Sequence, residues 1–326
     1  MPHIALLGAG FSRNWGGWLA PEAFEYLLGC SPVDEGLRHL LWSYKRRGGF
    51  EGALAQLQAD FAQRRDAASE ERLTKMQNAI MQMFADMDKA FGAISSFEPQ
   101  NESRYLVRSL LARFDAIFTL NQDLLLERHY LNQNVALSSY RKWNGWEIPV
   151  MRAVSGDGSQ DPAGATWSPM EPQNFVVNGN LQPYFKLHGS SNWVDASRGR
   201  ELVVMGGNKP SSIDQHLVLK WNHEQFREYL LRPNTRVMII GYSFGDEHIN
   251  RAIGQASDAG NLRLFIIDPL GVEVADEHRH HPIYSPGPLF TKLHPHLIGA
   301  SRRTLRETFG TDRVEHGKVM RFFESS

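Results

Sequence analysis

The sequence contains very little cysteine: Cys30 is the only one among 326 residues. A single thiol cannot form an internal disulfide, and it cannot supply the paired Cys-x-x-Cys ligands of a structural zinc site. We therefore expect a chain of the reducing cytoplasm without a zinc module. We expect Cys30 itself to be a buried, inert side chain after the end of a helix.

The chain also lacks a strong charge imbalance and a long apolar run. Its formal net charge is −1, so we expect no direct nucleic-acid binding and no attraction to an anionic membrane. The longest apolar runs, such as residues 237–241, are far too short to span a bilayer. The N-terminal residues carry neither a basic segment nor a cleavage site, so we predict no signal peptide.

Short apolar segments alternate with helical patterns along most of the chain. We expect strands at residues 4–7, 115–120, 184–187, 201–205, 235–240 and 262–267, and helices at 21–28, 103–114, 123–130, 223–231 and 247–258. This alternation predicts an α/β fold, a Rossmann-like doubly wound parallel sheet in a single domain spanning residues 1–326.

Two regions interrupt the alternation. Residues 35–91 carry apolar side chains at helical spacing, so we predict a helical insertion at about 35–100. Residues 132–183 are rich in Gly, Pro, Ser, Asn and Trp, which indicates an irregular excursion of loops and short strands.

Two motifs follow the first two predicted strands, at the edge where an open parallel sheet binds its ligands. The sequence Gly-Ala-Gly at residues 8–10, with Ser12, would let a pyrophosphate approach the amides that open a helix. Asn121 and Asp123 place an amide and a carboxylate two residues apart, which suits a ligand with hydroxyls and a carboxamide. The alternatives are a simple tight turn for the first motif and a helix cap for the second.

Two further motifs follow later strands. His188, directly before Gly189, is suited to reach a substrate as a general base, although a lone histidine is more often structural. The turn Gly-Tyr-Ser-Phe-Gly-Asp at residues 241–246 could cradle a phosphate or a ribose, or could simply start a helix at Asp246.

In this order and spacing, the motifs together resemble the sirtuin superfamily. Asn121-x-Asp123 matches its ribose and nicotinamide motif, His188-Gly189 its catalytic histidine, and Asp268 falls where the family contacts the adenosine ribose. The resemblance implies NAD as the substrate, with no metal, and catalytic roles for Asn121, Asp123 and His188. The cofactor-binding residues that it implies are Gly8, Ala9, Gly10, Phe11, Ser12, Asn121, Asp123, Gly241, Ser243 and Asp268.

Departures from the deacylating sirtuins narrow the prediction. Their four-cysteine zinc module and acyl-lysine groove motif are missing, and residues 14–21 replace their Gly-x-Pro-Asp-Phe-Arg stretch. Residues 11–14, 186–193 and 241–246 instead resemble the sirtuin-like domains of bacterial anti-phage defence, which deplete NAD. That resemblance implies an NAD glycohydrolase acting in abortive infection, as a homo-oligomer or beside a sensor subunit such as a HerA-type ATPase. The alternatives are a non-catalytic subunit that senses NAD or ADP-ribose, and an NAD-dependent protein deacylase.

The chemistry of the N-glycosidic bond assigns provisional roles. Its cleavage builds oxocarbenium character at the anomeric carbon, much as in glycoside hydrolysis. Asp123 would hold the nicotinamide carboxamide, Asn121 would orient the attacking water or the ribose hydroxyls, and His188 would accept a proton.

Three other features invite a prediction. The run Asp-Glu-His-Arg-His-His at residues 276–281 fits no common zinc spacing and is expected to be an exposed loop. Arg302, Arg303 and Arg306 are expected on a solvated helix face or a subunit contact. The insertion carries more apolar residues than one helix stripe needs, which predicts an oligomer interface or else a lid over the crevice: Trp42, Phe61, Met76, Met81, Met83, Phe84 and Met87.

Overall fold

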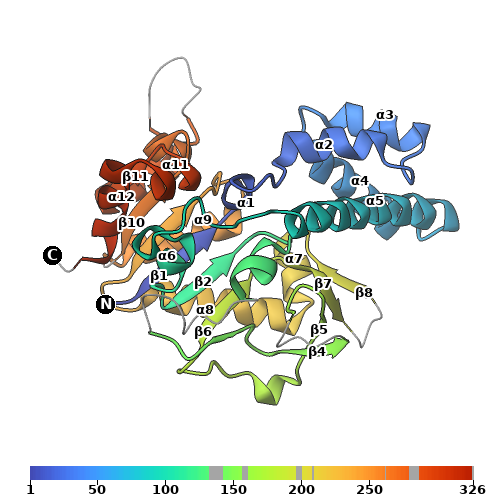
Figure 1. Ribbon diagram of the computed structural model, residues 1–326. Helices are drawn as coiled ribbons and strands as arrows, with labels where there is room; N and C mark the ends of the chain where they lie inside the picture. The colour runs from blue at the N-terminus through green and yellow to red at the C-terminus, as the bar shows by residue number, and fades with distance from the viewer. Residues whose placement is uncertain are drawn as a thin grey trace.

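The computed structural model describes residues 1–131, 142–155, 161–195, 200–207, 209–260, 262–278 and 286–324 (Figure 1). Its central element is a seven-stranded sheet with strand order β11-β10-β9-β1-β2-β6-β3, in which every pairing is parallel. The strands are β1 (His3–Leu7), β2 (Ala116–Thr119), β3 (Trp146–Glu147), β6 (Gln182–Lys186), β9 (Arg236–Ile240), β10 (Arg263–Ile267) and β11 (Leu297–Ser301). The predicted α/β fold with a Rossmann-like parallel sheet is therefore confirmed.

Both faces of the sheet are covered, because successive side chains of a strand point to opposite faces. Ile4 and Leu6 of β1 pack with one group of helices, and Ala5 and Leu7 pack with another. The first group is α8 (Leu217–Leu231), α9 (Glu247–Asp258) and α10 (Pro288–Leu293). The second is α1 (Ala9–Arg13), α6 (Val107–Leu111), α11 (Leu305–Gly310) and α12 (Arg313–Met320).

The order of the strands reverses at β1. From β1 the chain builds outward through β2 and β6 on one side, then returns to place β9, β10 and β11 on the other. In open α/β sheets such a reversal leaves a crevice at the carboxyl ends of the strands, where ligands bind. The crevice here lies between the turns that follow β1 and β9.

The helical insertion forms a block of four helices between β1 and β2 (Figure 1). Two of them begin at capping carboxylates: Asp34 accepts a hydrogen bond from the Leu37 amide, and Asp66 from the Ser69 amide. The four helices are α2 (Ala20–Gly29), α3 (Glu35–Tyr44), α4 (Gly49–Arg64) and α5 (Ala67–Gly92). The predicted helices at 21–28 and 35–91 are confirmed, and α2 belongs to the same block.

The chain enters and leaves this block at one place. The Trp15 and Phe97 rings stack with centroids 4.4 Å apart and an interplanar angle of 12°. The Trp15 Nε1 donates to the Phe97 carbonyl oxygen at 2.8 Å. The two connections therefore form a neck that is pinned on the sheet side of the block.

Most of the apolar residues that predicted an exposed surplus are buried inside the molecule. Met76, Met83, Phe84 and Met87 are all in the core that joins the block to the sheet domain. Of the other three, Phe61 and Met81 are half-buried, and Trp42 has 52 % of its surface exposed. Most of this surplus therefore packs inside the molecule and does not form an exposed surface.

A second, four-stranded sheet has the order β4-β5-β7-β8. Its strands are β4 (Met151–Ser155), β5 (Thr166–Pro169), β7 (Gly189–Asp195) and β8 (Arg200–Val203). The segment expected at 201–205 is therefore a strand of this sheet and not of the parallel one. Of the predicted irregular excursion at 132–183, residues 132–141 and 156–160 lie outside the described residues, and the remainder carries β3, β4, β5 and the start of β6.

The remaining elements are short. The helix expected at 103–114 is reduced to η1 (Ser103–Tyr105) and α6, and the one expected at 223–231 begins earlier, at Leu217. The others are η2 (Glu127–Leu131, a π-helical turn), η4 (Pro172–Asn174), α7 (Lys209–Asp214), η5 (Gly271–Ala275), η6 (His294–His296) and η7 (Arg321–Phe323). Within the described ranges, no helix combines the length and apolarity needed to cross a membrane.

Candidate active site

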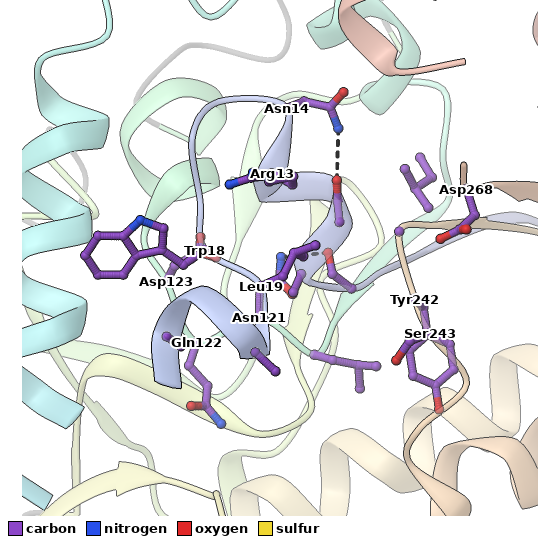
Figure 2. Close-up of a pocket in the computed structure, with 18 of the residues that line it drawn as sticks. Arg13, Asn14, Trp18, Leu19, Asn121, Gln122, Asp123, Tyr242, Ser243 and Asp268 are labelled. Atoms are coloured by element: carbon purple, nitrogen blue, oxygen red, sulfur yellow. Dashed lines mark hydrogen bonds between the residues drawn. The ribbon is translucent and has the colours of Figure 1, made fainter. Parts of the chain in front are cut away.

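A cavity of about 560 Å³ opens at the carboxyl ends of the parallel strands (Figure 2). Each of five strands contributes to its wall through the residues that follow it: Gly8 after β1, Asn121 after β2, His188 after β6, Gly241 after β9 and Asp268 after β10. The opposite wall comes from the insertion, through Pro21, Ala23, Phe50, Met83, Phe84 and Met87. The block of α2 to α5 is therefore a cover of this cavity, which was the second of the two expectations for it.

The glycines of the first and fourth motifs allow two turns to touch. A Cβ on Gly8 would lie 2.5 Å from the Gly241 carbonyl oxygen, and one on Gly10 would lie 2.7 Å from the Gly241 Cα. Gly241 also has a positive φ of 61°, which favours glycine. The Gly10 amide donates to the Gly241 carbonyl at 2.9 Å, and the Phe11 amide donates to Gly8 at 2.9 Å. These two amides are thus used inside the protein and are not free for a pyrophosphate.

Cationic side chains also line the cavity, whereas the first glycine motif predicted a pyrophosphate site made by backbone amides and the Ser12 hydroxyl. Arg13 lies on the wall and pairs with Glu22 at 2.6 Å, and Arg303 lies near Asp268 at the far end. Both guanidinium groups suit a phosphate-bearing ligand. Arg13 stands within the Phe-Ser-Arg-Asn stretch that the sequence had already singled out, which is the signal by which it could have been found.

Asn121 ties the end of β2 to the first glycine turn. Its Nδ2 donates to the Gly8 carbonyl and to the Ser12 Oγ, each at 3.0 Å. Both amide hydrogens are used in this way, so the group that remains for a ligand is the carbonyl oxygen Oδ1. Asn121 can therefore accept a hydrogen bond from a water molecule or a ribose hydroxyl.

Asp123 lines the cavity and also fulfils the alternative role of a local cap. Its Oδ1 accepts a hydrogen bond from the Leu125 amide at 3.1 Å. Burial raises the pKa of Asp123, while the Lys186 ammonium and the Leu125 amide oppose that rise. The carboxyl group is thus enclosed and held in a fixed orientation.

A buried ion pair lies beneath Asp123 and was not anticipated from the sequence. The Lys186 Nζ lies 2.6 Å from the Glu127 Oε1 and donates to the Asp123 carbonyl at 2.7 Å. The two charged side chains are 0 % and 1 % exposed. The signal was present, because Lys186 is a lone charge in the apolar strand β6 and Glu127 lies one helical turn after Asp123. This pair fixes the backbone that carries the site.

His188 lies in the turn that follows β6 and reaches the cavity, although the residue is only 3 % exposed. Burial lowers the pKa of His188 well below its usual value, against the carboxylate of Asp246, which raises it. The ring is therefore neutral at pH 7 and can accept a proton. Gly189 has a positive φ of 77° and abuts the backbone of β8, so a side chain at this position would clash. Glycine at position 189 is thus required by the turn that presents His188 to the cavity.

A charged cluster lies beside His188 on the same wall. The Lys209 Nζ is 2.8 Å from the Asp246 Oδ1 and 2.9 Å from the Glu51 Oε2. Lys209 therefore links the start of α9 to α4 of the covering block. Asp246 was expected as part of the turn at residues 241–246 or as a helix start, and Lys209 was not predicted as a site residue.

The structure brings together nearly all the predicted site residues. Gly8, Ala9, Gly10, Asn121, Asp123, His188, Gly241, Ser243 and Asp268 line the one cavity. Ser12 is buried and acts through Asn121, whereas the side chain of Phe11 packs in the core against Trp15. Phe11 is therefore a framework residue of the turn rather than part of the cavity wall.

The run at residues 276–281 is only partly described, since 279–281 lie outside the described residues. Its two acidic side chains accept hydrogen bonds from backbone amides. The Asp276 Oδ1 accepts from the His278 and Gly287 amides, and the Glu277 Oε1 from the Leu289 amide, each at 2.9 Å. These carboxylates thus hold a loop in place.

Comparison with known proteins gives one finding. The SIR2-like domain model matches residues 115–283, slightly more than half of the chain. The match includes Asn121, Asp123, His188, Ser243 and Asp268, and it leaves out the first glycine turn and the covering block. No curated protein matches the chain.

Proposed function

Because the chain belongs to the SIR2-like domain family, whose members bind NAD, we propose that it is an NAD glycohydrolase that releases nicotinamide and ADP-ribose. The observation that carries the proposal is the meeting of Asn121, Asp123 and His188 in one cavity. They come from the ends of two neighbouring strands, β2 and β6. An amide, an enclosed carboxyl group and a neutral imidazole are the groups that this hydrolysis needs.

The cavity suits a dinucleotide in shape and chemistry. It runs from His188 and Asp123 at one end to Asp268 and Arg303 at the other, across the point where the strand order reverses. The Asp268 carboxylate is suited to the hydroxyls of the adenosine ribose, and Arg13 to the pyrophosphate. The enclosed end is the one that would receive the nicotinamide riboside.

The residues of the enclosed end would divide the work as follows. Asp123 accepts hydrogen bonds from the carboxamide of the leaving nicotinamide. The Asn121 Oδ1 orients the attacking water, and His188 takes up the proton that this water gives away. The oxocarbenium character at the anomeric carbon is stabilised by the carboxyl group nearby. The leaving group departs neutral, because its ring nitrogen is cationic before cleavage.

Product analysis tests this proposal against its two alternatives. The purified protein is incubated with NAD, with and without an acetylated peptide, and the products are separated by chromatography. Release of nicotinamide and ADP-ribose without peptide supports the glycohydrolase. A requirement for peptide with formation of an acetylated product would identify a deacylase, and tight NAD binding without turnover would identify a sensing subunit.

We also propose that NAD hydrolysis serves as an anti-phage effector, under the control of self-association or of a separate sensor such as a HerA-type ATPase. The motif resemblance supports this role. The covering block supports the control, because a partner that moves α4 or α5 would reach the cavity wall directly. Light scattering on the purified chain tests self-association, and a clean monomer would leave control to a separate subunit.

A further inference from the structure

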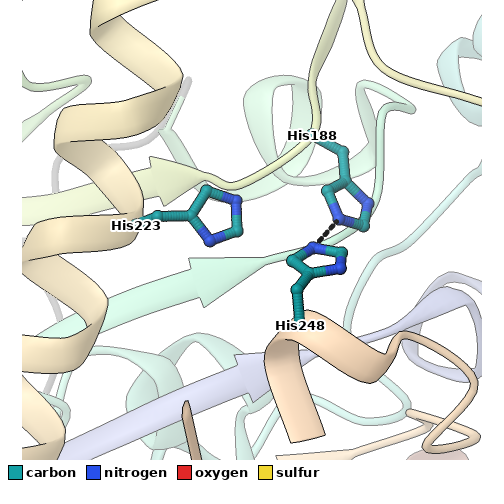
Figure 3. Close-up of side chains that lie close together, drawn as sticks. All are labelled: His188, His223 and His248. Atoms are coloured by element: carbon teal, nitrogen blue, oxygen red, sulfur yellow. Dashed lines mark hydrogen bonds between the residues drawn. The ribbon is translucent and has the colours of Figure 1, made fainter. Parts of the chain in front are cut away.

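Three histidine rings meet beside the cavity (Figure 3). His188 follows β6, His223 is in α8, and His248 is in the first turn of α9. One ring nitrogen from each lies within 4.8 Å of the other two. The closest pair is the Nε2 of His188 and the Nε2 of His248, at 3.1 Å.

From this arrangement we propose that His188, His223 and His248 form a binding site for one divalent transition-metal ion of the Zn²⁺ type. Three imidazoles with an open fourth position are a common ligand set for Zn²⁺. Zinc–nitrogen bonds of about 2.0–2.1 Å in a tetrahedral site separate two ligand nitrogens by about 3.3 Å. The 3.1 Å between His188 and His248 is already close to that separation.

The third ring completes the set after a modest movement. The His223 Nε2 donates to the Leu187 carbonyl oxygen at 2.9 Å, which holds the ring beside His188 and leaves the lone pair of the neutral ring on Nδ1. The three ligand nitrogens are at most 4.8 Å apart, so their separations must shrink by at most about 1.5 Å to reach the tetrahedral value of about 3.3 Å. Metal binding would therefore require small movements of the side chains, with the His223–Leu187 hydrogen bond kept or adjusted.

Charged side chains surround the three rings, and an ion can reach them. The Asp246 carboxylate, which shares the Lys209 ammonium with Glu51, favours a positive charge at all three rings, whereas Lys209 and Arg227 oppose it. His188, Asp246 and Lys209 all line the cavity, so an ion can reach the rings from the substrate side. Burial makes the three rings neutral at pH 7, the form that ligates.

The consequence of this site rests on the proposed function. An imidazole that holds a metal ion has no lone pair left to accept a proton. Metal bound through His188 therefore blocks the general base, so the ion acts as an inhibitor of NAD hydrolysis. The site would couple hydrolysis to the availability of free transition metal.

The first test measures binding alone, without NAD. Chelator-treated protein without a histidine tag is titrated with Co²⁺, followed by its visible ligand-field absorption, and with Zn²⁺ by calorimetry. The expected result is one ion per chain with the spectrum of tetrahedral Co²⁺. No binding by the folded wild-type chain, or a spectrum of purely octahedral Co²⁺, would overturn the site.

Matched variants assign the ion to these rings. His223→Gln keeps a donor for the Leu187 carbonyl, His248→Gln removes a second ring, and His39→Gln changes an exposed histidine elsewhere. Substitutions outside the ligand shell cost about 10–100-fold in metal affinity, so loss of a ligand should cost at least ~10²-fold. His39→Gln should bind as the wild type does. Unchanged binding in both cluster variants would place the ion elsewhere; if either variant fails to fold by circular dichroism, the wild-type Co²⁺ spectrum decides.

The second test separates the site from the proposed function. NAD hydrolysis is measured at increasing Zn²⁺ and after chelator is added. Inhibition that follows the occupancy measured by calorimetry, and that chelator reverses, supports the regulatory role. Full activity at full occupancy would overturn that role, whereas absence of hydrolysis in metal-free protein would instead refute the glycohydrolase and leave the binding result standing.

Discussion

At the scale of single residues, His188 has the clearest predicted phenotype. Its neutral ring should act as the general base, so His188→Ala should lower kcat by at least ~10²-fold while the fold is retained. Since burial holds the pKa of His188 well below 6.5, the wild-type rate should decline only at pH values below that. Kinetics across pH, with His39→Ala as control and circular dichroism for the fold, provide the measurement. Near-normal turnover would remove His188 from the mechanism.

Variants of Asn121 and Ser12 can separate two roles of Asn121, which are to orient the reacting groups and to hold the glycine turn in place. Both take part in the hydrogen bond that joins β2 to the glycine turn, but only Asn121 presents an oxygen to the cavity. Asn121→Ala should therefore lose turnover by at least ~10²-fold with a modest loss of NAD affinity, and Ser12→Ala should lose far less turnover. Calorimetry and steady-state kinetics on both variants check this. Equal losses would mean that Asn121 serves only to hold the turn.

At the scale of elements, the Lys186–Glu127 pair joins β6 to the π-helical turn η2. Lys186→Met leaves Glu127 buried without its counter-ion, to stay charged or to take up a proton, and should lower the free energy of unfolding by about 3–5 kcal/mol. The double change Lys186→Met with Glu127→Leu should recover most of this loss, because both charges are then removed. Urea denaturation measures the effect.

An exposed pair provides the control for that series. Lys292 and Asp258 lie 2.8 Å apart, with side chains 51 % and 57 % exposed. Lys292→Met should change the free energy of unfolding by at most about 1 kcal/mol, since exposed ion pairs contribute little. A loss at Lys186 no larger than this would show that the buried pair does not support the site.

Some of the strands could be predicted from the sequence and others could not. Five strands of the parallel sheet and the motifs at their ends were predictable, because β1 and its neighbours are short apolar segments that end at Gly, Asn or His. The second sheet as a whole was not, although a strand at 201–205 was expected, since β7 begins directly after His188 and joins β8, which is close by in the sequence, to β5, which is not. Local pattern carries no information about such pairing.

Some residues of the candidate site could likewise be predicted from the sequence, and others could not. Asn121, Asp123 and His188 stand out in the sequence because polar residues at strand ends meet at one edge of a sheet. Lys186, the three-histidine cluster and the covering position of α5 depend on which elements pack together in space. Their residues are spread over more than one hundred positions, and no local spacing links them.

At the scale of the whole molecule, buried histidines predict how stability depends on pH. Burial lowers the pKa of His223 to about 3 and that of His3 to about 4, and it lowers those of His188 and His248 as well. The unfolded chain binds these protons at about pH 6.5, so their contribution is present above that pH and is lost as the pH falls below it. At about pH 5, each histidine that stays unprotonated in the folded chain should lower the free energy of unfolding by about 2 kcal/mol.

Variant denaturation isolates one of these contributions. His223→Gln keeps the hydrogen bond to Leu187 and removes the titrating group, so its unfolding free energy should fall less steeply than that of the wild type between about pH 7 and pH 5. Parallel urea titrations at several pH values give the slopes. Identical slopes would show that His223 is protonated in the folded chain.

The neck at Trp15 and Phe97 has a consequence for how this molecule can be altered. The chain leaves the sheet domain and returns to it at this neck. The two flanking segments therefore lie the same distance apart whatever the number of residues in the helical block. The block is thus an exchangeable module. We expect that another insert with ends that meet could replace it at the same neck, which would give the cavity a different wall opposite the strand ends.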